Sequence, residues 1–133
     1  MNAIPLSHEA QELLFLEARS ANTFTDEPVT DGQLHAIWDL MKWAPTSGNI
    51  NPLRILFLRS PEARERMVQH MSEGNQGKTR SAPMAALLAA DRDFHEFVPQ
   101  LFPDRADQAD WYATYEGRGE MATFNATLQA AYF

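Results

Sequence analysis

The sequence contains no cysteine, which excludes disulfide bonds, thiolate metal sites and a cysteine nucleophile. Long apolar runs are also missing. The longest, Ala82 to Ala90, has nine residues and includes a proline, whereas a membrane span needs about 18. Basic residues are scarce: 11 Lys and Arg stand against 18 Asp and Glu, a formal net charge of −7. Nucleic acids and anionic membranes are bound largely through basic groups, so neither is expected as a partner.

Motifs that mark common catalytic folds are missing too. The sequence has no Gly-x-Ser-x-Gly elbow, no Gly-x-Gly-x-x-Gly loop and no Walker sequence. Residues 74–77 match the Gly-x-x-Gly loop of an RNA-binding KH fold, but the acidic balance argues against that interpretation. Residues 1–5 lack the basic start of a secretory signal, and the apolar run 13–16 is too short for one, so a cytoplasmic location is expected.

The length and composition fit one domain. The chain has 133 residues, of which 44% are hydrophobic and 22% charged, values ordinary for a globular protein. We therefore expect a single domain over residues 1–133.

The first half of the chain carries clear local signals. Ser7 is expected to cap a helix over residues 7–20, followed by a polar connector over 19–29. Thr30 and Gln33 form a capping box for a second helix that ends before Pro45. Helical spacing predicts the residues of this second helix that face the core to be Leu34, Ile37, Trp38 and Met41.

The remaining segments alternate between loops, strands and helices. Residues 45–52 are rich in Pro, Gly and Asn and predict a loop. Apolar runs predict strands over 53–59, buried on both faces, and over 83–90. Ser60 is expected to cap a helix over residues 61–71 that begins at Pro61. Further helices are expected over 76–82 and 120–133, with an aromatic cluster in the irregular stretch 91–119. Two strands alone make no stable sheet, so the sheet needs further partners.

Three groups of polar residues could bind a ligand. Arg19, Ser20 and Asn22 follow the first helix, and an Arg fork with a hydroxyl suits a phosphate. Asn75 and Lys78 lie one helical turn apart and could together hold a polarised carbonyl. Taken alone, each group is more often a cap or a turn than a binding site. The third group provides hydroxyls and an amide from the proline-rich loop, at Thr46, Ser47 and Asn49.

A metal site is a further alternative. Asp91, Asp93 and His95 alternate, so on a strand they would share one face and could bind a metal ion. A solvated strand exit explains the same pattern, and we favour that interpretation. No metal is expected.

In this order, the polar segments resemble the nitroreductase family of FMN-dependent oxidoreductases. Residues 15–20, 40–49, 74–79 and 125–132 carry the resemblance. The similarity extends over essentially the whole chain, and the malonic semialdehyde reductase type (3-hydroxypropanoate dehydrogenase) of the Rut pyrimidine-degradation pathway is its closest match. The resemblance implies an α+β fold in which a central sheet is flanked by helices.

The resemblance also implies a homodimer with two FMN sites, each built from both subunits, and NAD(P)H as the hydride donor. Hydride would pass through the flavin to a small aldehyde or to a nitro, enone or quinone acceptor. Arg19 and Ser20 would hold the phosphate and ribityl end, beside Asn22, while Asn75 and Lys78 would face the pyrimidine edge. The residues that would reach the flavin of the other subunit are Pro45, Thr46, Ser47, Asn49 and Asn125. The pocket cover that would contact substrate falls at Trp111, Tyr112 and Tyr115.

Three features depart from the family pattern. Asn22 stands where many members have a basic residue, and Asn51 replaces a common glutamine. The chain also stops at Phe133 inside an expected helix, where family members continue. We therefore expect a C-terminally truncated member. A non-catalytic paralogue that acts by association or weak flavin binding stays an alternative to the oxidoreductase.

Overall fold

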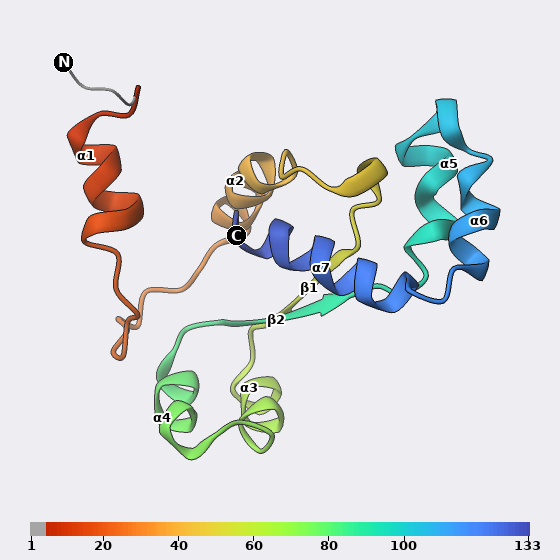
Figure 1. Ribbon diagram of the computed structural model, residues 1–133. Helices are drawn as coiled ribbons and strands as arrows, with labels where there is room; N and C mark the ends of the chain where they lie inside the picture. Colours follow the sequence, from red (N-terminus) through yellow and green to blue (C-terminus); the bar gives the residue numbers. More distant parts are fainter. Residues whose placement is uncertain (1–4) are drawn as a thin grey trace.

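The computed structural model describes residues 5–133; residues 1–4, which belong to the segment predicted not to be a secretory signal, lie outside it. Figure 1 shows the order of the elements along the chain. They are α1 (His8–Gln11), η1 (Glu12–Leu16), α2 (Asp31–Met41), η2 (Ser47–Asn49), β1 (Leu53–Leu58), α3 (Pro61–Val68), α4 (Glu73–Ser81), β2 (Ala85–Ala90), η3 (Phe94–Phe97), α5 (Val98–Leu101), η4 (Pro103–Arg105), α6 (Gln108–Thr114) and α7 (Arg118–Ala130).

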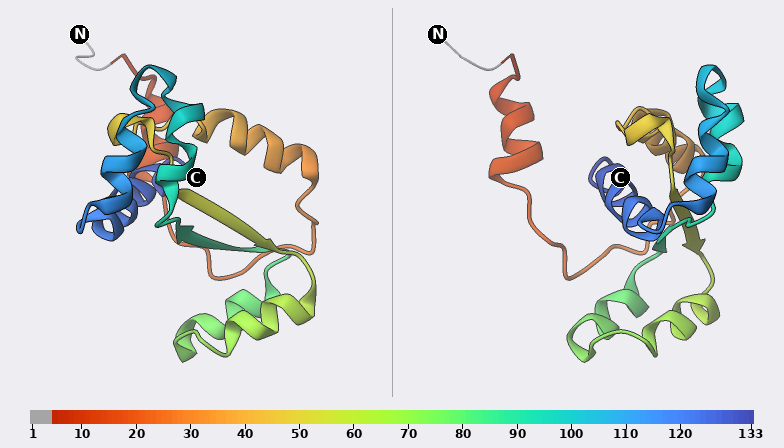
Figure 2. Two further views of the ribbon diagram at one scale, coloured as in Figure 1. Left: turned by 90° about the vertical axis from the view of Figure 1, so that its right-hand side faces the viewer. Right: turned by 45° about the vertical axis from the view of Figure 1, so that its right-hand side comes forward.

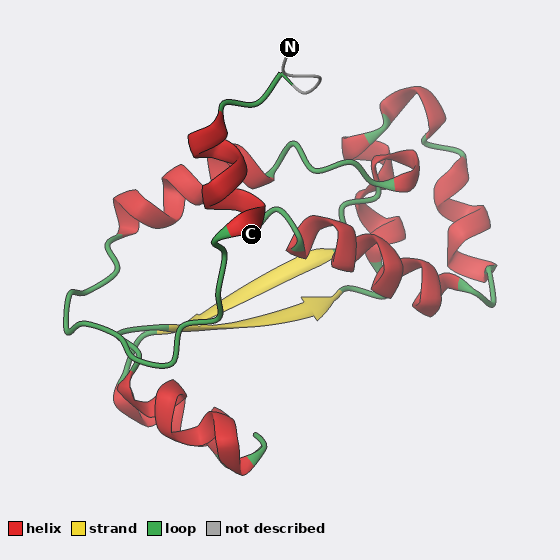
Figure 3. Ribbon diagram, turned by 60° about the vertical axis from the view of Figure 1, so that its left-hand side comes forward, coloured by secondary structure: helices red, strands yellow, loops and turns green. Residues whose placement is uncertain are grey.

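The two strands form an antiparallel pair that organises the helices. Leu53 pairs with Ala90 at one end, and Leu58 pairs with Ala85 at the other. Helix α7 lies along the pair (Figure 1), and the α3–α4 hairpin connects the strands at the Leu58 end (Figure 3). Helices α5 and α6 lie together beyond the opposite end (Figure 2). A two-stranded sheet is marginal in water, so the packed helices must stabilise it. The α+β prediction is confirmed.

Strand β1 is not buried on both faces, contrary to the sequence prediction. Leu53, Ile55 and Phe57 are half-buried on the face that meets α2 and α7. On the other face, Leu56 is 58% exposed and Arg54 is exposed as well. The contiguous apolar run suggested two covered faces, whereas within residues 5–133 the long helices cover one.

The N-terminal helix is shorter than predicted. Its cap is confirmed, because the Ala10 amide donates to Ser7 Oγ at 3.1 Å. However, the helix widens into the π-type turn η1 and ends at Leu16 rather than at residue 20. Four consecutive apolar residues point around a helix instead of along one face, so they define no stripe that could be buried.

The caps of the next two helices are confirmed. The Gln33 amide donates to Thr30 Oγ1 at 3.3 Å, and the Thr30 amide donates to Gln33 Oε1 at 2.8 Å. Ser60 accepts from the Ala63 amide at 3.2 Å. The prediction of which α2 residues face the core is confirmed only in part. Met41 is buried, whereas Trp38 is 53% exposed.

The core lies where the predicted loop meets the irregular stretch and α7. Its buried cluster is Ile50, Phe94, Val98, Tyr112 and Ala122. The rings of Phe94 and Tyr112 pack edge to face with centroids 5.3 Å apart, which confirms an aromatic cluster in this stretch. Among residues 5–133, no helix is both long and apolar enough to cross a bilayer.

Candidate functional site

The loop before β1 has an unusual backbone. Gly48, Asn49 and Asn51 all have positive φ angles, of 56°, 53° and 40°. Asn tolerates this region better than most residues because its short amide can bond locally. Here the Asn51 amide nitrogen Nδ2 donates to Asn49 Oδ1 at 2.8 Å, and the Asn51 backbone amide donates to Thr46 Oγ1 at 3.3 Å. The loop thus keeps one defined shape.

Helix α7 anchors this loop through Asn125. The Ser47 amide donates to Asn125 Oδ1 at 2.8 Å, and Asn125 Nδ2 donates to the Met121 carbonyl at 2.9 Å. Asn125 is only 2% exposed. The structure therefore brings together Ser47 and Asn125, two residues that the family resemblance assigns to the same flavin.

Sequence reasoning missed a second anchor, Gln129, which is 4% exposed. Its Nε2 donates to Asn51 Oδ1 at 2.9 Å, and its Oε1 accepts from the Leu53 amide at 2.9 Å. The available signal was its spacing: four residues after Asn125, it lies on the same face of α7. Asn51, which replaces the glutamine common in the family, thus forms a hydrogen-bonded pair with Gln129.

Gly48 allows the loop to approach the core closely. A Cβ atom at this position would lie 2.8 Å from Tyr112 Oη, and the positive φ disfavours any L side chain. Gly48→Ala is expected to lower the free energy of unfolding by about 1–2 kcal/mol from the backbone alone, with a further loss from the contact. A urea titration measures this loss.

Two further variants make that test specific. In a Tyr112→Phe background the contact is removed, so Gly48→Ala should cost less than it does alone. Gly77→Ala, inside α4 with open space around its Cβ position, should instead stabilise by about 0.5–1 kcal/mol. Equal effects at the two glycines would contradict the close approach.

The Arg-Ser-x-Asn segment meets helix α4. Lys78 Nζ donates to Asn22 Oδ1 at 3.4 Å, which joins two of the predicted groups. The Arg19 guanidinium donates to the Leu16 and Ala18 carbonyls at 3.2 and 2.7 Å, and Ser20 is exposed nearby in sequence. The Asn75 side chain donates back to Ser72 Oγ at 3.2 Å.

Helices α3 and α4 are joined at their surface by an ion pair. Arg80 contacts both carboxylate oxygens of Glu65, at 2.8 and 3.0 Å. The hydrogen bonds from Arg80 hold the pKa of Glu65 below its usual range. Both side chains are about half exposed, so this pair adds little to stability.

The polar residues that could bind a ligand lie at the two opposite ends of the strand pair. The loop 45–52 precedes Leu53, whereas α4 precedes Ala85, the partner of Leu58. The six residues of β1 separate these ends by about 20 Å. One chain therefore does not bring its proline-rich loop to its own Lys78.

The predicted pocket-cover residues divide between surface and core. Trp111 stacks on Tyr115 with centroids 4.8 Å apart and planes 16° apart, and the two are 54% and 41% exposed. Tyr112 is 6% exposed and packs in the core. The stacked pair offers an open aromatic surface, whereas Tyr112 supports the fold.

The alternating acidic residues do not share a strand face, because β2 ends at Ala90. Asp91 binds Arg54 Nη2 at 2.7 Å, and Asp93 lies 3.4 Å from Arg118 Nη2. Within residues 5–133, no three His, Cys, Asp or Glu side chains are grouped closely enough to hold a metal ion. The basis for the metal alternative is therefore wrong.

The structure thus combines an antiparallel strand pair, a helix that buries two side-chain amides against it, and polar residues suited to a ligand at the two ends of the pair. The chain belongs to the nitroreductase family, whose model matches residues 16–131. A Streptomyces coelicolor relative named "Putative NADH dehydrogenase/NAD(P)H nitroreductase" is 56% identical over 98% of this chain and 67% of its own length. A relative of the same name from Streptomyces griseus is 54% identical over the same shares.

Solved structures share the fold. The enone reductase CLA-ER matches with a TM-score of 0.79 at 15% identity, over 95% of this chain and 68% of that one. An Exiguobacterium sibiricum protein solved in complex with FMN matches with a TM-score of 0.74 at 16% identity, over 90% and 65%. At such identities these likenesses show the fold alone. The chain spans about two thirds of the length of its relatives.

Proposed function

We propose that this chain belongs to an FMN-dependent NAD(P)H oxidoreductase that works as a homodimer with two shared flavin sites. The observation that carries the proposal is the separation of the two ligand groups. Loop 45–52 and Lys78 lie at opposite ends of β1, so a flavin that contacts both needs loop and helix from different chains. In a two-fold dimer, the loop end of one sheet can lie beside the Lys78 end of the other.

The residues at the α4 end fit FMN in their chemistry. The guanidinium of Arg19 and the hydroxyl of Ser20 suit a phosphate and a ribityl chain, and neither side chain is buried. Lys78 and Asn75 supply a cation and an amide on one face of α4, which suit the carbonyls of a pyrimidine ring. Asn22, bonded to Lys78, would orient the ammonium group.

The loop end would complete the site from the second chain. Pro45, Thr46, Ser47 and Asn49 form a turn whose shape Asn125 and Gln129 fix from α7. Such preorganised donors orient a bound ring without ordering costs at the moment of reaction. The aromatic surface of Trp111 and Tyr115 would cover the reacting partners and exclude water, with Tyr112 supporting it from below.

FMN, when bound, supplies hydride transfer between NAD(P)H and an acceptor. The chain's own contribution is binding and electrostatics: Lys78 places a positive charge at the pyrimidine edge, and no side chain is assigned as a dedicated acid or base. We propose a small aldehyde such as malonic semialdehyde as the acceptor, with nitro, enone or quinone compounds as the other classes. The sequence motifs support this choice, and a panel of these acceptors under steady-state assay tests it. We also propose a cytoplasmic location and a single domain over 1–133.

Lys78→Gln is expected to raise the dissociation constant of FMN at least tenfold, because a hydrogen bond from a charged donor contributes about 1.5–3 kcal/mol. Quenching of FMN fluorescence on binding measures the constant. Lys42→Gln is the matched control, because Lys42 pairs with Asp39 on the surface of α2. Equal affinity in the Lys78 variant and the parent would contradict the role of Lys78.

A non-catalytic flavin-binding or associating protein is the second candidate. The exposed apolar residues of η1 support the association that this candidate requires, whatever the chemistry of the protein. Both candidates predict a dimer, but only the oxidoreductase predicts that NAD(P)H bleaches the bound flavin under anaerobic conditions. A bound flavin that stays oxidised in excess NADH and NADPH would favour the second candidate.

A further inference from the structure

Trp111 and Tyr115 present an aromatic surface that stays open to solvent. The two rings are nearly parallel, with planes 16° apart and centroids 4.8 Å apart. Trp111 is 54% exposed and Tyr115 is 41% exposed. Helix α6, which carries Trp111, lies with α5 beyond one end of the strand pair (Figure 2). Exposed rings of this kind favour contact with a further ring, because aromatic pairs are stabilised beyond the area that they bury.

The neighbours of this ring pair hold it in place. The buried ring of Tyr112 packs edge to face against Trp111, with centroids 5.0 Å apart. Gly117 leaves room for Tyr115, since a Cβ atom at Gly117 would lie 2.7 Å from Tyr115 Cζ. The φ angle of Gly117 is −76°, which any residue adopts, so the missing side chain is what the structure uses here. The ring pair is therefore preformed, and binding a ligand requires little ordering of its side chains.

Carboxylates surround the ring pair. Asp107, Trp111 and Tyr115 follow one another at intervals of four residues, so they lie along one face of α6. Asp110 and Glu116 adjoin the two rings in sequence, and all three acids are exposed. Within residues 5–133, none of these three carboxylates forms an ion pair. Their negative charge is therefore free to attract a cation.

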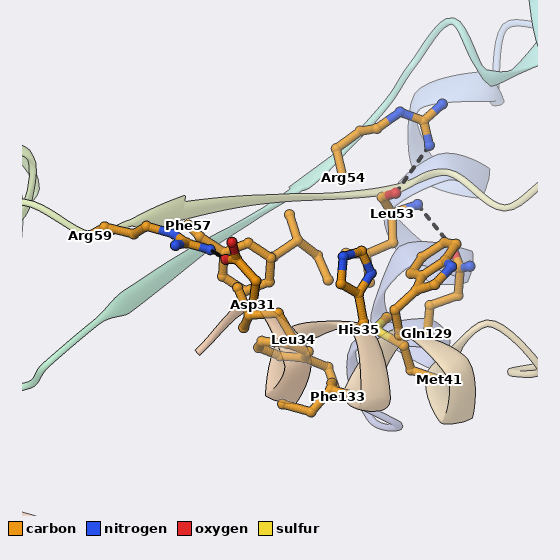
Figure 4. Close-up of a pocket in the computed structure, with 13 residues that line it drawn as sticks. Asp31, Leu34, His35, Met41, Leu53, Arg54, Phe57, Arg59, Gln129 and Phe133 are labelled. Atoms are coloured by element: carbon orange, nitrogen blue, oxygen red, sulfur yellow. Dashed lines mark hydrogen bonds and ion pairs between the residues drawn. The ribbon is translucent and has the colours of Figure 1, made fainter. Parts of the chain in front are cut away.

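Charges near other apolar surfaces of the chain are balanced. Beside the cavity between α2 and β1, Arg59 forms an ion pair with Asp31 (Figure 4). The exposed ring of Trp43 has the Lys42 ammonium group 5.6 Å from its centroid, so a cation of the chain already lies over it. On η4 and on α6 with its two caps, by contrast, Arg105 is the one basic residue against three acids.

We propose that the Trp111–Tyr115 surface binds a flat aromatic cation, a ring of the pyridinium type, in preference to neutral or anionic rings. Parallel rings suit a flat ligand, and an aromatic surface with nearby carboxylates suits a positive charge. The binding site itself needs no flavin. Its meaning for the reaction rests on the proposed function: oxidised nicotinamide is a pyridinium cation and reduced nicotinamide is not. The surface would then bind the oxidised product more tightly than the reduced donor.

Titration of the flavin-free chain, followed by NMR of its three indole N–H groups, tests this preference. The probes are nicotinamide methylated at its ring nitrogen, nicotinamide and nicotinate, which share a ring and differ in charge. The Trp111 signal, identified by its loss in Trp111→Phe, should shift saturably with the cation. The dissociation constant of the cation should be about fivefold below that of nicotinamide, and nicotinate should bind most weakly. Trp43 is the internal control, and its signal should not saturate.

Three results would overturn the proposal: no saturable shift at Trp111, equal constants for the cation and the neutral ring, or equal shifts at Trp43. A double Asp107→Asn/Asp110→Asn chain should bring the constants of the cation and nicotinamide within about twofold of each other. Asp107 makes no side-chain cap hydrogen bond, so the helix does not depend on its charge. Asp26→Asn/Glu27→Gln is the matched control, because it makes the same change of charge in the connector before α2 and should keep the full preference.

Failure of this inference and failure of the proposed function give different results. Bleaching of a bound flavin by NAD(P)H, together with equal binding of the cation and the neutral ring at Trp111, would overturn the inference and leave the proposed function intact. A flavin that stays oxidised, together with tighter binding of the cation at Trp111, would contradict the proposed function and leave the binding site intact.

Discussion

Phe94→Ala is expected to lower the free energy of unfolding by about 3–5 kcal/mol, measured by urea titration. Phe94 is 0% exposed and lies at the centre of the core, against the ring of Tyr112. Its removal leaves a cavity between the irregular stretch and the loop before β1. Since small domains have only about 5–15 kcal/mol of stability in total, this single change should remove a large share.

Phe97→Ala is the matched control, three residues further along the same segment. Phe97 is 38% exposed and lies under the Arg54 guanidinium, 5.0 Å from its ring centroid. The loss there should be smaller, about 1–2 kcal/mol, because the ring is only partly buried and its surface cation–π contact adds about 0.5–1 kcal/mol. If both variants lost the same amount, Phe94 would not be the centre of the core.

Asn125→Ala is expected to destabilise by about 1–3 kcal/mol and to weaken FMN binding. The variant leaves the Ser47 amide without its acceptor in a part-buried position. Because that hydrogen bond fixes the loop, the loop end of the flavin site should become disordered even where the fold survives. Urea titration and FMN fluorescence measure the two effects separately.

The control for this variant lies one half-turn away on the same helix. Thr123 is exposed and bonds only within α7, to the Gly119 carbonyl at 2.9 Å. Thr123→Ala should change stability by less than about 0.5 kcal/mol and leave FMN affinity unchanged. An Asn125→Ala protein that binds FMN as tightly as the Thr123 variant would show that the loop needs no anchor from α7.

Local signals in the sequence predicted the parts of the fold that depend on neighbouring residues. Ser7, Thr30 and Ser60 cap their helices as expected, because a cap is a bond between residues three apart. The loop 45–52 also followed from its own composition. Contacts between distant segments were harder to predict: Gln129 meets Asn51 across 78 residues, and its spacing from Asn125 indicates only the face of α7 on which it lies, not its partner.

Burial was predicted least well, because it depends on what covers a surface. The apolar run of β1 indicated two buried faces, but Leu56 remains 58% exposed. The same limit applies to residues 13–16, whose apolar character gave no sign that they stand outside the body of the chain. In the candidate site, the sequence identified the residue types at each end, whereas only the register of β1 and β2 shows that the ends lie apart.

Mixing two defective chains tests the shared flavin site most directly. Lys78→Gln and Asn49→Ala impair opposite ends of the proposed site, so each variant alone should bind FMN poorly. After mixing and re-equilibration, half of the dimers should be heterodimers, each with one intact site and one doubly defective site. Tight binding should therefore return to about a quarter of all sites, measured by FMN fluorescence. A mixture that binds no more FMN than its separate components would contradict a site built from two chains.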